Sequence, residues 1–100
     1  MKLKDFDETI INGMKDPEFA SAYLQDALDE SLEEFLIALR LYVQAHGGLG
    51  RCAEKTHLTR EALYRMLSEN GNPELRSIDM ILKAYGLRFG VQRREERAAA

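Results

Sequence analysis

The strongest constraint on this sequence is a series of short apolar stripes at helical spacing, separated by residues that begin or end helices. Apolar side chains recur every three or four positions over residues 19–28 and again over residues 35–43. That spacing places them on one face of a helix. Asp16-Pro17-Glu18 is typical of a helix start, because a capping carboxylate, a proline and an acid all suit a first turn. The pattern predicts an all-α fold of five to six short helices.

The other boundaries in the first half follow the same rules. Residues 6–14 predict a short first helix, although Gly13 weakens it. Ser31, followed three positions later by Glu34, is typical of a capping box. The helix that it begins is expected to end near His46, before a glycine pair.

The second half carries equally local signals. The run Asn70-Gly71-Asn72-Pro73 predicts a loop. Ser77 is expected to cap a last helix, which Gly86 ends. Apolar and polar residues then alternate over residues 87–91, which predicts a short strand-like segment after the last helix.

Size and composition limit the class of protein. A chain of 100 residues suits one domain, and we assign residues 1–92 to it and residues 93–100 to a flexible tail. Hydrophobic residues make up 45% and charged residues 31%, which is typical of soluble globular proteins. No apolar stretch is long enough for a membrane span, and no signal peptide is recognisable. The single cysteine, Cys52, fits a reducing compartment, so we expect a cytoplasmic protein.

Charge is divided unevenly along the chain. Residues 1–35 carry three lysines against ten acidic residues, a net charge of −7. Residues 36–92 carry eight basic residues against five acidic ones, a net charge of +3. This asymmetry suggests two surfaces with different partners. Acidic residues that merely keep exposed helices soluble explain the pattern equally well.

Residues 49–68 satisfy the demands of a helix-turn-helix, in which two short helices cross closely. Ala53 supplies the small side chain needed at the crossing. Four residues fall at inward-facing positions, namely Cys52, Leu58, Leu63 and Met66. His57 occupies the turn position that is usually glycine, and histidine adopts left-handed backbone more readily than most residues. Gly50 stands where a serine or threonine cap is expected.

The second helix of this motif is expected to begin at Thr59, to run to about Ser68 and to have one apolar and one polar face. The polar face suits a DNA major groove, because arginine can pair with guanine and tyrosine can bond to a phosphate. The candidate DNA-binding residues are Arg51, Lys55, Thr59, Arg60, Glu61, Tyr64, Arg65, Ser68 and Arg76. An ordinary pair of core helices with a solvated charged face is the alternative.

Enzymatic and metal chemistry find little support. His46, Cys52 and His57 have spacings that match no zinc motif. Cys52 lies at an inward position, so it fits an inert core residue better than a nucleophile paired with His57. We predict no catalytic residue, no metal site and no cofactor.

Residues 58–73 resemble the signature of the addiction-module antidote proteins, which are HigA-type antitoxins of the XRE-like helix-turn-helix superfamily. The resemblance continues in residues 16–28, 45–48 and 84–88, so it covers about residues 16–91. It implies a homodimer that binds double-stranded operator DNA, represses its own operon and neutralises a small basic toxin of the RelE/ParE type. The main alternative is a stand-alone transcriptional regulator, and another is an interaction module that has lost DNA binding.

The resemblance also indicates where the partners would bind. A toxin that holds RNA must be basic, so we expect the acidic N-terminal third to be the toxin surface. Two contacts are candidates for the homodimer. One is pairing of the segment 87–91 with its twin, since a lone strand leaves unpaired backbone groups. The other is the apolar remainder of the N-terminal helices.

Overall fold

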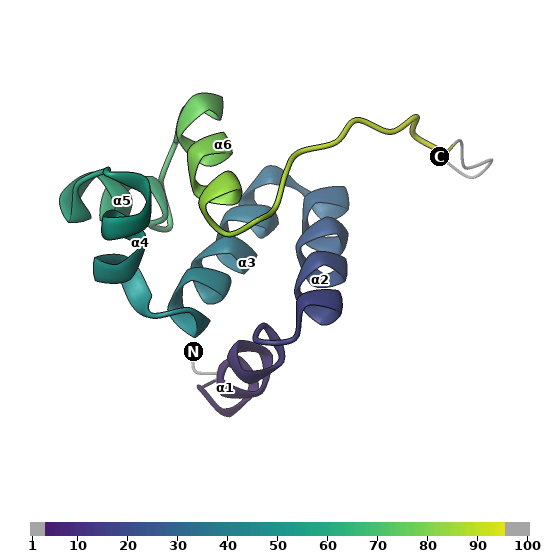
Figure 1. Ribbon diagram of the computed structural model, residues 1–100. Coiled ribbons are helices and arrows are strands. Elements are labelled where there is room, and N and C mark those ends of the chain that lie inside the picture. The colour runs from purple at the N-terminus through teal and green to yellow at the C-terminus, as the bar shows by residue number, and fades with distance from the viewer. Residues whose placement is uncertain (1–3, 96–100) are drawn as a thin grey trace.

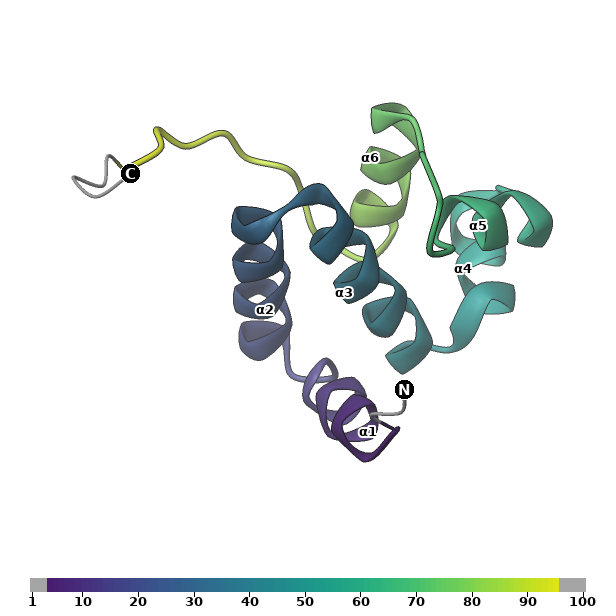
Figure 2. The same cartoon turned by 180° about the vertical axis from the view of Figure 1, so that it is seen from behind.

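The computed structural model describes residues 4–95, and within this range it contains six helices and no strand (Figure 1). The helices are α1 (Lys4–Gly13), α2 (Pro17–Glu30), α3 (Leu32–Ala45), α4 (Gly48–Thr56), α5 (Arg60–Met66) and α6 (Leu75–Ala84). In both views α3 runs through the middle, with α1 and α2 on one side and α4, α5 and α6 on the other (Figures 1 and 2). The prediction of an all-helical fold is therefore confirmed.

Hydrogen bonds at the helix starts test the capping residues that the sequence predicts. The Ser31 side-chain oxygen accepts a bond from the Glu34 amide at 3.0 Å, as expected for the cap of α3. Asp16 precedes α2 as expected, but its side chain makes no capping bond. The prediction that Ser77 caps the last helix is wrong. The Glu74 carbonyl already accepts bonds from the amides of Ser77 and Ile78, so α6 begins one turn earlier.

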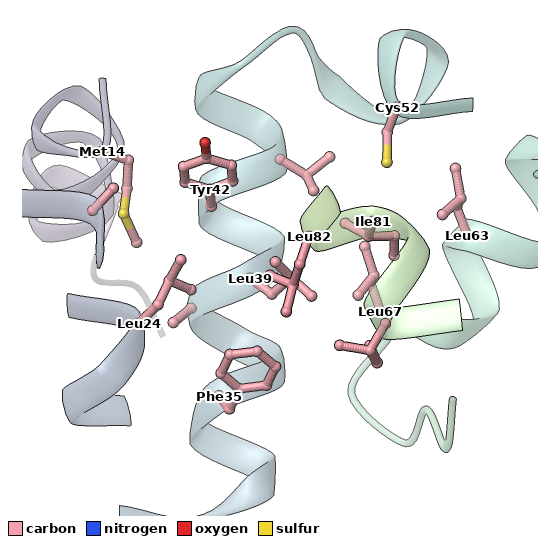
Figure 3. Packing of buried hydrophobic residues seen from close by; sticks show 14 of the residues in the cluster. Met14, Leu24, Phe35, Leu39, Tyr42, Cys52, Leu63, Leu67, Ile81 and Leu82 are labelled. Atoms are coloured by element: carbon pink, nitrogen blue, oxygen red, sulfur yellow. The ribbon is translucent and has the colours of Figure 1, made fainter. Parts of the chain in front are cut away.

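The apolar faces of the helices meet in one core around α3 (Figure 3). Side chains from every helix enter it, and Met14, Leu39, Leu63 and Ile81 are wholly buried. Most of these helices are too short to be stable alone in water. Their stability therefore comes from this shared burial of apolar surface.

The segment after α6 corrects a prediction, because residues 87–95 form an irregular extended chain rather than a strand. The Leu87 amide donates to the Leu82 carbonyl at 2.8 Å and closes α6. Phe89 is partly buried, with its ring centroid 6.3 Å from that of Phe35, whereas Val91 is exposed. The alternation of apolar and polar residues over residues 87–91 thus reflects docking of the Leu87 and Phe89 side chains onto the core. Of the predicted flexible tail, residues 93–95 are exposed and irregular, and residues 96–100 lie outside the described range.

Gly71 is the position where the backbone leaves least room. A Cβ atom there would overlap the Met66 carbonyl oxygen and lie 2.7 Å from that of Arg65. We predict that Gly71→Ala lowers the free energy of unfolding by about 1–3 kcal/mol, the usual cost of overpacking. The matched control is Gly50→Ala, where the new methyl meets open space inside α4. Alanine should stabilise that helix by up to about 1 kcal/mol. Urea denaturation measures the unfolding midpoints of both variants, and equal midpoints for Gly71→Ala and Gly50→Ala would contradict the prediction.

Candidate nucleic-acid interface

A three-residue turn joins α4 to α5, and the two helices pack against each other. His57 has φ 67° and ψ 15°, so the predicted left-handed conformation is confirmed. Its amide donates to the Ala53 carbonyl at 2.8 Å and closes α4. Thr59 accepts a bond from the Ala62 amide at 3.0 Å on its side-chain oxygen, which confirms it as the cap of α5. Local chemistry therefore fixes both ends of the turn.

Thr56 also holds this turn, although the sequence analysis did not single it out. Its hydroxyl donates to the Cys52 carbonyl at 2.8 Å and accepts from the Leu58 amide at 3.2 Å. The side chain is buried, so both bonds are shielded from water. The sequence does contain a signal for this role. Thr56 carries a hydroxyl four residues after the inward-facing Cys52, immediately before the connection at His57.

Because the Leu58 amide would lose its acceptor, Thr56→Val should lower the free energy of unfolding by about 1–3 kcal/mol. Valine has nearly the same shape, so the loss would report the hydroxyl rather than a cavity. Ser21→Ala is the control, since the Ser21 hydroxyl is exposed and bonds only within its own helix. Thermal denaturation compares the two variants, and similar losses in both would argue against this role for Thr56.

Two predicted boundaries of these helices are incorrect. α4 begins at Gly48 after Gly47, so Gly50 lies within the first turn and is not the cap. Gly47 and Gly48 both have positive φ, which allows the chain to turn sharply out of α3. α5 ends at Met66 rather than near Ser68, whose hydroxyl donates to the Arg65 carbonyl at 2.8 Å. The Ser68 amide donates to the same carbonyl at 3.3 Å, so Ser68 closes the last turn of α5.

The outer face of α5 is on the surface, as the sequence pattern predicts. Leu63 is wholly buried, whereas the next residue, Tyr64, is 68% exposed. The exposed predicted residues at the start and on the outer face of this helix are Thr59, Arg60, Glu61, Tyr64 and Arg65. Ser68, partly buried, lies just beyond its end. This short helix therefore presents two arginines and a tyrosine to solvent.

The other predicted residues lie elsewhere. Arg51 and Lys55 line a pocket shared with α3 and α6, and Lys55 Nζ stands 5.3 Å from the centre of the Tyr85 ring. Arg76 is exposed in the first turn of α6. The residues predicted as one DNA-binding set are thus distributed over three helices and their ends.

Cys52 is wholly buried, as expected for a core residue. Burial raises the pKa of its thiol, an effect that the nearby Tyr85 hydroxyl and the charge of Lys55 partly oppose. Burial also raises the pKa of Tyr85. Both groups therefore stay protonated near neutral pH. Within residues whose side chains are described, no three histidine, cysteine or acidic residues are placed to hold a metal ion.

A second hollow, of about 460 Å³, lies between α2 and α3. Its apolar lining residues include Tyr23 and Ile37, and Ile37 is 41% exposed. Four acidic residues surround them, namely Asp26, Asp29, Glu30 and Glu34. No basic residue is among the described residues that line this hollow. The acidic groove, as we name it, therefore offers apolar surface within a negatively charged rim.

Comparison with known proteins places these features in a family. A family model described as a probable addiction module antidote protein matches residues 2–93. The chain belongs to this family. An uncharacterized protein of Haemophilus influenzae is 30% identical over 91 residues, which are 91% of this chain and 92% of the relative. No solved structure matches the chain significantly.

Membership in the antidote family has general consequences. An antidote of an addiction module has a toxin as its partner, and such antidotes are in general not enzymes. The match to the antidote model spans all six helices, so it includes both the acidic groove and the α4–α5 pair. Among the described residues of this protein, no helix is long and apolar enough to span a membrane.

Proposed function

We propose that this protein is a cytoplasmic antitoxin that also binds operator DNA and represses its own operon. In this proposal α4 and α5 form a helix-turn-helix of the XRE-like, HigA type, within one domain that spans residues 1–92. The observation that carries the DNA-binding part is the outer face of α5, which holds exposed Arg60, Tyr64 and Arg65 above a buried apolar face. The family match supports the antitoxin part.

Each side chain then has a distinct role at the DNA. α5 enters the major groove, where Arg60 and Arg65 donate to guanine edges and Glu61 accepts from a cytosine amino group. Tyr64 bonds to a phosphate, as do the basic residues on α4 and Arg76 on α6. Thr59 lies at the start of the reading helix, and Ser68 lies just beyond its end. A homodimer would place two such helices about one DNA turn apart on a pseudo-palindromic site.

The DNA-binding prediction is tested by Arg65→Ala. Because the Arg65 side chain is exposed, its loss should leave the fold intact and weaken specific binding by about 1–3 kcal/mol. Gel shifts with the DNA upstream of the gene, repeated over a range of salt concentrations, measure the effect. Arg88→Ala is the control, since Arg88 is an exposed arginine beyond α6. Unchanged operator binding in the Arg65 variant would remove this residue from the reading face.

We further propose that the acidic groove binds the toxin, a small basic protein of the RelE/ParE type. Charge complementarity and the apolar surface of Ile37 and Tyr23 support this position. Deleting residues 1–30 would not test it cleanly, because Ile10, Met14 and Leu24 belong to the core. The test must remove charge without removing core residues.

The double variant Asp26→Asn, Glu30→Gln removes two exposed charges of the groove. We expect it to bind the small basic protein of the adjacent reading frame about tenfold more weakly, mainly through slower association, at low salt. The control variant Glu54→Gln, Glu69→Gln removes two exposed acids outside the groove. Co-purification followed by biolayer interferometry measures both. Equal affinities would contradict the groove assignment. Absence of any partner would favour the stand-alone regulator.

A further inference from the structure

Arg51 and Lys55, the α4 cations that the proposed function assigns to DNA phosphates, also line a pocket, and no described residue of α5 is in its lining. It has a volume of about 560 Å³ and lies where the α1–α2 turn meets α4 and the C-terminal ends of α3 and α6. This volume falls within the usual range for small-molecule sites in proteins. Segments far apart in the sequence thus build one concave surface.

Three aromatic rings form one wall of the pocket. The Tyr42 and Tyr85 rings meet edge to face at 5.3 Å, and the His46 ring lies 4.3 Å from that of Tyr42. His46 Nε2 is also 3.0 Å from the Met14 carbonyl oxygen, which ties the α1–α2 turn to the end of α3. The Tyr85 hydroxyl is buried on the side of Cys52. Contacts among the three rings and the contact of His46 with Met14 therefore hold the aromatic wall in place.

The charges at the pocket have one sign. Its charged lining residues are Lys15, Arg51 and Lys55, and all three are exposed. Among the residues whose side chains are described, no acidic one lines the pocket, and none forms an ion pair with these three cations. The chain as a whole carries a net charge of −3, so this cationic site is a local departure from the average.

These features together specify a ligand chemistry. Ammonium and guanidinium groups attract an anionic head, and the faces of aromatic rings favour a flat apolar body. We propose that the pocket binds a small planar organic anion, with the aromatic body against the partly buried rings of His46 and Tyr85 and the anionic head toward Arg51 and Lys55. This proposal goes beyond the proposed function and depends on neither DNA binding nor toxin binding.

The experiment titrates the full chain with naphthalene-2-carboxylate and follows backbone amide signals by NMR. Its alcohol and ammonium analogues, 2-naphthalenemethanol and 2-naphthylmethylammonium, keep the ring and change the charge. We expect saturable shifts at His46, Gly86 and Leu87 with the carboxylate only. The double variant Arg51→Met, Lys55→Met should weaken binding about tenfold, since each exposed charge contributes modestly. The control, Arg60→Met with Arg65→Met, removes two exposed cations from α5 and should bind normally.

The amide spectrum of each variant also reports whether it is folded, so a lost ligand can be distinguished from a lost fold. Equal binding of the alcohol would overturn the anionic part of the proposal. Inorganic phosphate binding as tightly as the carboxylate would overturn the planar part. Absence of saturation, or equal weakening in the α5 control variant, would overturn the site itself.

Discussion

Burial of α3 is the constraint on which the rest of the structure depends. This helix contacts α1 and α2 through one side and α4 through another, and Leu39 at its centre is wholly buried. Phe35 and Tyr42 extend the apolar surface toward its two ends. Among the described residues, α3 is the helix with substantial contacts both to the α1–α2 pair and to the group formed by α4, α5 and α6. The acidic groove on α2–α3 and the exposed face of α5 are therefore held in one frame by the packing of a single helix.

Arg40 adds a polar contact to this apolar frame. From α3 its Nε donates to the Leu67 carbonyl, directly beyond the C-terminal end of α5. The orphan carbonyls at a helix end carry partial negative charge, so a cation is favourable there. Another nitrogen of the same guanidinium, Nη2, is buried without a partner among the described residues. The end of α5 is thus fixed to α3 by a charge-assisted bond, in addition to the burial of Leu63 and Leu67.

The features that the sequence predicted correctly are those that local chemistry decides. The caps at Ser31 and Thr59 and the left-handed turn at His57 each depend on a few neighbouring residues, and each is present. Ser77 failed as a cap because Glu74 and Leu75 begin α6 first, and two acceptable starts within one turn are not separable by pattern alone. The strand-like alternation of residues 87–91 failed for a different reason. A strand requires a partner strand, whereas here Phe89 docks against the Phe35 ring.

The placement of Arg51 and Lys55 shows where periodicity stops being informative. Their separation of four residues predicts a common face of α4, and the structure agrees, because both line the same pocket. Which neighbour that face meets depends on contacts between distant parts of the chain. The end of α6 brings Tyr85 beneath Lys55, and the His46 contact with Met14 brings the α1–α2 turn close. Helical spacing identifies which side chains act together, but the packing around α3 decides whether they face solvent, a pocket or a partner.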